Sequence, residues 1–193
     1  MKEYIRQEFS KTQSTLEQLA ADENAAAQIE KIVGLCCQAL RTGNKILFAG
    51  NGGSAADAQH LAGELVSRFN FDRPGLAALA LTTDSSVLTA IGNDYGYDQV
   101  FARQLNAVGV AGDVFFGIST SGRSPNILNA LCQARRKGLI TVGLTGKDGG
   151  DMPPLCDYCL SVPSSETPKI QEGHIMLGHM ICGLIEREMF GGD

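Results

Sequence analysis

The sequence predicts an α/β protein: a three-layer sandwich in which a parallel sheet is covered by helices on both faces, preceded by a helical extension. Four short apolar runs are each followed by a loop and then a helical or mixed segment: 45–50, 76–81, 113–118 and 139–146. These runs lack strict polar–apolar alternation, which is typical of strands buried on both faces. Residues 1–42 show helical spacing with no strand between. Together these features predict a parallel sheet that binds its ligand beyond the carboxyl ends of the strands.

The first forty residues predict two helices. Apolar side chains recur at helical spacing on both sides of "ADEN" at 21–24, where the pattern breaks. The positions are Ile5, Phe9, Leu16 and Leu19, then Ile29, Ile32, Val33, Cys36 and Leu40.

The rest of the chain repeats strand, loop and helix. "KILFAG" leads through a glycine loop into an alanine- and leucine-rich helix, and "LAALAL" leads into "TTDSSVLTAIGND". "DVFFGI" leads into the hydroxyl-rich segment "STSGRSPNI", and "LITVGLTG" is followed by "KDGGDMPPLCDYCLSV". A last helix is predicted over 167–189, with an apolar stripe made by Ile170, Leu177, Met180, Ile181, Leu184 and Ile185.

Composition excludes several classes of partner. The chain has 193 residues and a formal charge of −5, with no basic stripe for nucleic acid or an anionic membrane. No apolar run reaches the roughly 18–20 residues that span a bilayer, and the N-terminal segment does not resemble a signal peptide. We therefore expect a cytoplasmic protein without nucleic-acid or membrane partners. Its six cysteines, including the lone CxxC at 156–159, are expected to be reduced.

The hydroxyl-rich loop predicts an anion site. Ser119, Thr120, Ser121 and Ser124 gather where Ser124 and Pro125 favour the start of a helix. Free N–H groups and the helix dipole attract an anion there, and a phosphate monoester fits. The alternative is a serine-rich turn with one helix cap. The loop lacks the P-loop pattern for a nucleoside triphosphate.

Histidines and a carboxylate form a second candidate site. His60 and Glu64 are four residues apart, on one face of the predicted helix, where they could chelate a metal, act as an acid/base couple or form an ordinary surface pair. Gln171 and His179 lie about 12 Å apart along a straight helix. They could share one ion only if the helix bends or a neighbouring subunit contributes. His174 points elsewhere and is interpreted as a packed or interface histidine.

Five segments together resemble the phosphoheptose isomerases (sedoheptulose 7-phosphate isomerases) of the sugar isomerase (SIS) domain family. They are "GNGGSAADAQHLAGE", "LTAIGNDYGY", "GISTSGRSPNI", "LTGKDGG" and "TPKIQEGHIMLGHMICGLIE". The resemblance extends over nearly the whole chain. It implies a flavodoxin-like SIS fold with a five-stranded parallel sheet, formed by one SIS domain over 1–193. It also implies a homotetramer assembled through the 1–42 extension, with active sites at subunit interfaces.

The resemblance further implies an isomerase that interconverts sedoheptulose 7-phosphate and D-glycero-D-manno-heptose 7-phosphate, the first step toward nucleotide-activated heptose for lipopolysaccharide or other surface glycans. It implies one Zn²⁺ per subunit, held by His60, Glu64, Gln171 and His179. The implied substrate contacts are Asn51, Gly52, Gly53, Glu64, Asn93, Asp94, Ser119, Thr120, Ser121, Ser124 and Gln171. Pro168 and Lys169 depart from an acidic or small residue and arginine found in many members, so no catalytic role is transferred to an acidic residue there.

Moving a carbonyl from C2 to C1 needs a base, an acid and a stabilised enediolate. Glu64 and His179 are the candidates for the two proton transfers, and Zn²⁺ could polarise the oxygens. A carboxylate bound to zinc is a weakened base, so the ligand set would have to rearrange when sugar arrives.

Two other hypotheses compete with this one. The first is a non-catalytic SIS module that senses a phosphosugar or binds a replication initiator, a group expected to lack the full set of two histidines, Glu and Gln. The second is an isomerase for another phosphosugar, whose members usually carry additional domains.

Overall fold

The computed structural model describes residues 1–191. Its α-helices are α1 (Lys2–Ala20), α2 (Glu23–Arg41), α3 (Gly53–Val66), α4 (Ser85–Tyr95), α5 (Val100–Val108), α6 (Pro125–Arg136) and α7 (Thr167–Phe190). Its strands are β1 (Ile46–Gly50), β2 (Ala78–Ala80), β3 (Val114–Ile118), β4 (Ile140–Thr145) and β5 (Tyr158–Ser161). Two short 3₁₀ turns, η1 (Tyr97–Gln99) and η2 (Pro153–Leu155), lie between these elements.

The strands form one parallel sheet in the order β2-β1-β3-β4-β5. Ile46 of β1 lies opposite Ala78 on one side and Val114 on the other. The chain runs from β1 to β2 at one edge and then returns to β3 on the other side of β1, so the strand order reverses there. Parallel sheets bind ligands beyond the carboxyl ends of the strands at such a reversal. The loops after β1 and β3 therefore border the expected binding crevice.

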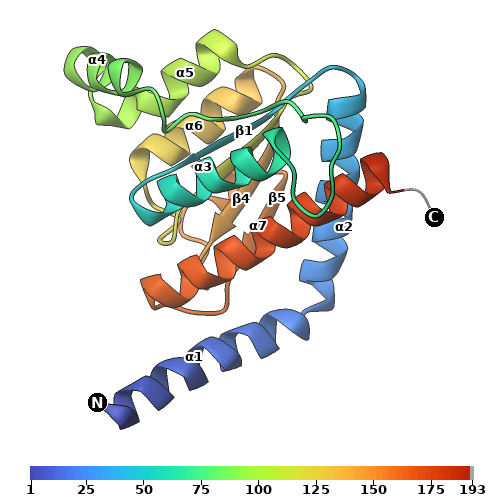
Figure 1. Ribbon diagram of the computed structural model, residues 1–193. Helices are drawn as coiled ribbons and strands as arrows, with labels where there is room; N and C mark the ends of the chain where they lie inside the picture. The colour runs from blue at the N-terminus through green and yellow to red at the C-terminus, as the bar shows by residue number, and fades with distance from the viewer. Residues whose placement is uncertain (192–193) are drawn as a thin grey trace.

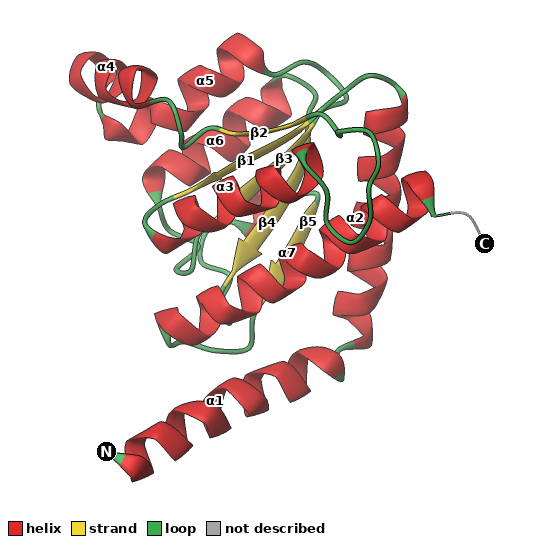
Figure 2. Ribbon diagram, in the orientation of Figure 1, coloured by secondary structure: helices red, strands yellow, loops and turns green. Residues whose placement is uncertain are grey.

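Helices cover both faces of the sheet, as Figure 2 shows, which confirms the predicted three-layer architecture. Ile46 and Phe48 of β1 pack into a core shared with α2, α3 and α7. Leu47 and Ala49, which point to the opposite face, pack into a second core shared with α5 and α6. Every residue of β1 is buried, in agreement with its lack of alternation.

Helices α3 and α7 run side by side in front of the sheet (Figure 1). Their close approach depends on Gly178, because a Cβ at this position would lie 2.5 Å from Cδ2 of Leu61. The thiol of Cys182, one turn further along α7, lies 3.8 Å from the carbonyl oxygen of Leu61. This seam between α3 and α7 carries the candidate metal ligands described below.

The chain breaks between the two N-terminal helices where the sequence predicted. Asp22 caps α2, its carboxylate accepting hydrogen bonds of 3.0 Å from the N–H groups of Asn24 and Ala25. Helix α1 stands away from the sheet (Figure 1), and Thr15 and Leu19 are its buried residues within the described chain.

A buried lysine fastens α1 to the start of α7. Lys169 is 5% exposed, and its Nζ lies 2.9 Å from Oγ1 of Thr12 and 3.2 Å from Oε2 of Glu8. The residue that departs from the family pattern therefore ties the extension to the domain.

All six cysteines are free. The thiols of Cys156 and Cys159 both lie against Gly143 of β4. In the described part of the chain, no helix combines the length and the apolar character needed to cross a bilayer.

Candidate active site

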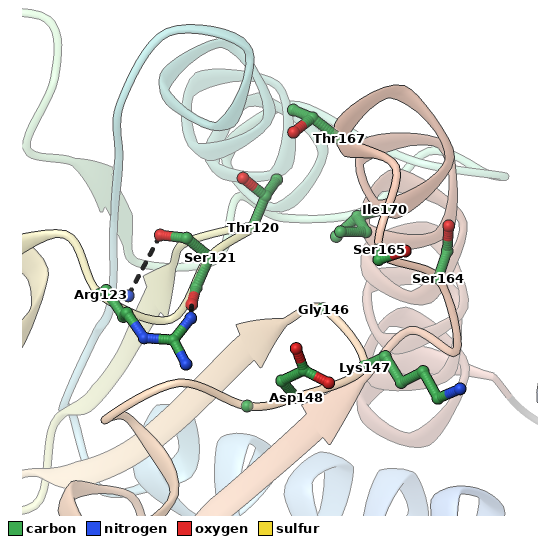
Figure 3. Close-up of a pocket in the computed structure, with 11 residues that line it drawn as sticks. Thr120, Ser121, Arg123, Gly146, Lys147, Asp148, Ser164, Ser165, Thr167 and Ile170 are labelled. Atoms are coloured by element: carbon green, nitrogen blue, oxygen red, sulfur yellow. Dashed lines mark hydrogen bonds between the residues drawn. The ribbon is translucent and has the colours of Figure 1, made fainter.

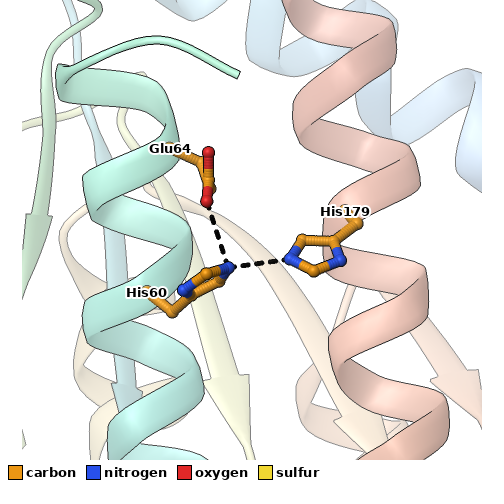
Figure 4. Close-up of side chains that lie close together, drawn as sticks. All are labelled: His60, Glu64 and His179. Carbon is orange, nitrogen blue, oxygen red and sulfur yellow. Dashed lines mark hydrogen bonds and ion pairs between the residues drawn. The ribbon is translucent and has the colours of Figure 1, made fainter. Parts of the chain in front are cut away.

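Three side chains converge between α3 and α7 (Figure 4). Nε2 of His60 lies 2.8 Å from Nε2 of His179 and 3.1 Å from Oε1 of Glu64. His60 and Glu64 come from successive turns of α3, as their spacing predicted, and His179 reaches them from α7. The side chain of His60 is 48% exposed and that of Glu64 is 22% exposed, so the cluster is open to a ligand.

The cluster fits a divalent cation. One donor atom from each of His60, Glu64 and His179 lies within 4.8 Å of the others. Two imidazoles and one carboxylate are a ligand set that metal sites use while keeping a coordination position for substrate. Both rings present Nε2 to the same point, which is the arrangement that a shared ion requires.

The side chain of Gln171, the fourth predicted ligand, reaches from α7 to the start of α3. Its side-chain amide occupies the space that a Cβ at Gly53 would fill. Helix α7 is continuous from Thr167 to Phe190, so it carries Gln171 to the glycine loop and His179 to the metal ligands. One chain thus assembles three of the four predicted ligands, and the fourth lies against a predicted substrate loop.

The hydroxyl-rich loop follows β3 and leads into α6, which begins at Pro125 as predicted. Ser124 occupies the N-cap position, but its side chain makes no capping hydrogen bond. Its Oγ instead lies 2.9 Å from Oγ of Ser119, a residue that is only 3% exposed. The hydroxyl groups of Ser119 and Ser124 are therefore held together beside the start of α6. Pro125 has no N–H and the N–H of Ile127 donates to the carbonyl oxygen of Ser124, so the N–H of Asn126 is the first that α6 offers to an anion.

A cavity of about 200 Å³ opens beside this loop (Figure 3). Thr120 and Ser121 line one side, and the loops after β4 and β5 line the others. Two cationic side chains, Arg123 and Lys147, border it and favour an anionic ligand. Its lining is completed by Gly146, Asp148, Gly149, Ser164, Ser165, Thr167 and Ile170.

Two glycine loops meet at the rim of the cavity. Gly122 has a φ of 63°, and a Cβ there would overlap the carbonyl group of Gly149. Gly150, with a φ of 59°, lies equally close to the backbone of Gly122. This backbone-to-backbone contact gives a physical reason for glycine in both "STSG" and "KDGG".

A pair of amides joins the loop after β1 to the start of α6. Asn51 donates to Oδ1 of Asn126 at 2.9 Å, and Asn126 donates back to Oδ1 of Asn51 at 2.8 Å. Sequence reasoning missed Asn126, which is 3% exposed. A polar side chain in the first turn of a helix gives no signal that it reaches across to another loop.

Asn93 and Asp94, also predicted substrate contacts, lie exposed near the end of α4. Nδ2 of Asn93 donates to Oδ1 of Asp94 at 2.8 Å. Within residues 1–191 no hydrogen bond joins either of them to the other predicted site residues.

Helices α3 and α7 carry two more ionisable groups, Asp57 and His174. Asp57 lies one turn before His60, and its Oδ2 is buried without a hydrogen-bond partner among the described atoms. Burial raises the pKa of the Asp57 carboxyl, while nearby His60 lowers it. His174 is fully buried, with Nε2 3.0 Å from the carbonyl oxygen of Thr145, and burial lowers its pKa to about 4. His174 is therefore a packed histidine, as interpreted from its helical position.

The chain is similar to known proteins over nearly its whole length. Residues 9–146 match the family model "SIS domain". Phosphoheptose isomerases from Burkholderia pseudomallei (strain 1710b) and Aneurinibacillus thermoaerophilus are 57% and 58% identical, covering 97% and 98% of this chain and 95% and 96% of theirs. The solved phosphoheptose isomerase of Neisseria gonorrhoeae has a TM-score of 0.89 at 42% identity, covering 96% of this chain and 98% of that one. That of Francisella tularensis has a TM-score of 0.92 at 34% identity, covering 96% and 97%.

Proposed function

The chain belongs to the phosphoheptose isomerases of the SIS domain family, and from that membership we propose that it interconverts sedoheptulose 7-phosphate and D-glycero-D-manno-heptose 7-phosphate. The observation that carries the proposal is the convergence of a carboxylate, Glu64, with two imidazoles on the seam between α3 and α7. An aldose–ketose isomerase needs such a pair of proton-transfer groups beside a phosphate site. The hydroxyl-rich loop supplies the phosphate site.

In the proposed reaction, Glu64 removes a proton from one of the two carbons and His179 returns a proton at the neighbouring carbon, through an enediolate. Ser119, Thr120, Ser121 and Ser124 bind the phosphate. Asn51, Gly52, Gly53, Asn93, Asp94 and Gln171 contact the rest of the sugar, as does Glu64. Holding the phosphate at one end fixes the reacting carbons relative to the acid and the base.

We propose one Zn²⁺ per subunit, held by His60, Glu64, Gln171 and His179. When bound, zinc would supply Lewis-acid polarisation of the sugar oxygens. The donor set supports this choice, since zinc takes imidazole nitrogen and carboxylate oxygen. A carboxylate that coordinates a cation is a weaker base, so Glu64 would act either as a metal ligand or as the base at any one time.

A coupled assay with sedoheptulose 7-phosphate, with and without chelator, tests this function. We expect turnover that falls on chelation and returns when Zn²⁺ is added. A chain that binds the phosphosugar without turning it over in either condition would instead be a non-catalytic SIS module. Turnover of a pentose or aminosugar phosphate in preference to the heptose would overturn the substrate assignment.

We further propose that residues 1–193 form one SIS domain, of which the last two residues lie outside the described part, and that it assembles into a homotetramer through the 1–42 extension. The support is an exposed apolar face on α1, where Tyr4, Ile5 and Phe9 are 64%, 47% and 74% exposed. Apolar faces of this kind are typical of interaction sites. The proposed partners are a phosphorylated seven-carbon sugar and three further copies of the chain.

Substituting Phe9→Asp is expected to convert the tetramer to smaller species, because the charge would be buried in the interface. Sedimentation velocity measures the change, with Ser10→Asp as the matched control one residue along the same helix. If the active sites need two subunits, activity per chain should fall as the tetramer is lost. An unchanged tetramer for Phe9→Asp would contradict the assignment of this face.

We propose a cytoplasmic location, without nucleic-acid or membrane partners, and entry of the product into nucleotide-activated heptose for lipopolysaccharide or another surface glycan. The acidic net charge of −5 supports the absence of a nucleic-acid partner.

A further inference from the structure

A buried ion pair connects the segment after α3 to the last turns of α7. Arg73 is 9% exposed and Glu186 is fully buried, and Nε of Arg73 donates to Oε1 of Glu186 at 3.1 Å. Neither residue belongs to the candidate site. Buried ion pairs seldom add much stability compared with apolar side chains of similar size. The pair is therefore better explained by the geometry that it imposes than by its contribution to stability.

The carboxylate of Glu186 fixes the path of the segment after α3. Its two oxygens accept hydrogen bonds from the backbone N–H groups of Phe69 at 2.8 Å and Asn70 at 2.6 Å. Burial alone would raise the pKa of Glu186, but these N–H groups and Arg73 together lower it, which keeps the acceptor ionised.

Phe69 is held in this way against a candidate catalytic residue. Its ring centroid lies 5.6 Å from that of His179, with the planes at 43°. Gly183, one turn after His179, makes room for the ring, because a Cβ there would lie 3.0 Å from Cε1 of Phe69. Glu186 thus restrains one side of the His179 imidazole through Phe69.

The guanidinium of Arg73 fixes the end of α3. It donates to the carbonyl oxygens of Glu64 at 2.8 Å and Leu65 at 2.6 Å, and also to that of Ser67 at 3.0 Å. The last carbonyl groups of a helix lack partners within the helix, and a cation satisfies them well. Arg73 therefore holds the backbone of the turn that carries Glu64.

We propose that Arg73 and Glu186 are positioning residues that set the spacing of Glu64 and His179 by fastening α3 to α7. One end of the pair holds the backbone of Glu64 and the other holds the ring that packs on His179. The proposal rests on the acid/base roles proposed above for these two residues. Proton transfer demands this control, since a misplacement of about 1 Å can cost about 10²-fold in rate.

The first test changes the ring without disturbing the ion pair. Phe69→Leu is compared with Phe71→Leu, which alters another aromatic residue of the same segment. Both rings line a second cavity, which His179 also borders. We expect Phe69→Leu to lower kcat about 10-fold with KM within about twofold, because the imidazole is misoriented while sugar contacts remain. Phe71→Leu should leave kcat near that of the unsubstituted chain. Equal kcat values for the two variants and the unsubstituted chain would overturn the link through Phe69.

The second test needs no activity. The chain has only three histidines, so ¹⁵N-histidine spectra of the full chain resolve each ring. Glu186→Gln keeps the side-chain shape but presents an NH₂ group to backbone N–H groups. At a single pH we expect the ring signals of His60 and His179 to shift, while buried His174, which contacts Thr145, stays unchanged as an internal control.

The outcomes separate this proposal from the proposed function. A folded Glu186→Gln chain with all three histidine signals unchanged would overturn the positioning role, whatever the substrate. Shifted His60 and His179 signals in a chain that turns over no heptose phosphate would support the positioning role and overturn the function. If Glu186→Gln does not fold, the His179 signal of Phe69→Leu decides, and an unshifted signal counts against the proposal.

Discussion

Replacing Glu64 by glutamine is expected to lower kcat by about 10²- to 10⁴-fold while sugar binding persists. Glutamine keeps the shape of the side chain and an oxygen that can still meet a metal, but it removes the basic carboxylate. The proton on the sugar carbon then has no acceptor at this position. Three measurements on this one variant separate a base from a ligand: steady-state kinetics, bound metal and affinity for sedoheptulose 7-phosphate.

A ligand role alone gives a different pattern. In that case Glu64→Gln reduces the metal content, and excess zinc restores much of the activity. Glu23→Gln, an exposed carboxylate on α2, serves as the matched control. Full turnover with normal metal content would mean that Glu64 has neither role and that the active site lies elsewhere.

The double substitution Ser119→Ala and Ser124→Ala is expected to weaken binding of the phosphorylated sugar by about 10²- to 10⁴-fold. Hydrogen bonds to a charged group contribute about 1.5–3 kcal/mol each, and two of them are removed. The two hydroxyl groups lie 2.9 Å apart, so they can act on one phosphate. Isothermal titration with the phosphosugar measures the loss.

Two controls accompany this experiment. Ser161→Ala, at the exposed end of β5, removes a hydroxyl group outside the loop and should not change affinity. The circular dichroism spectrum of the double variant should match that of the unsubstituted chain. Unchanged affinity would refute the assignment of the loop to phosphate.

The sequence predicts most of the architecture because its periodicities are strong. Strands β1, β3 and β4 are apolar runs buried on both faces, and α7 ends one residue beyond its predicted boundary. Strand β5 is different: it has four residues and is only partly buried, so apolar periodicity does not mark it and the family resemblance supplied the fifth strand. Pattern analysis also gives no path for the segment between α3 and β2.

The candidate site, too, is only partly predictable from the sequence. His60 and Glu64 follow from helical spacing, because neighbours four residues apart share a face. His179 is 119 residues away from His60, and no local pattern joins the two. Asn126, Arg73 and the roles of Phe69 and Glu186 depend on contacts between segments, which only the folded chain reveals.

The position of His179 on the last helix has a consequence for folding. Contacts between residues far apart in sequence form slowly, because a long loop must close before they stabilise the chain. His60 and Glu64 lie on α3, so their meeting with His179 has to await the docking of α7 on a sheet whose strands all precede it. A metal or sugar that needs all three side chains then binds the native state alone. Its free energy of binding adds to the free energy of unfolding, and saturation at about 100 times Kd contributes about 2.7 kcal/mol.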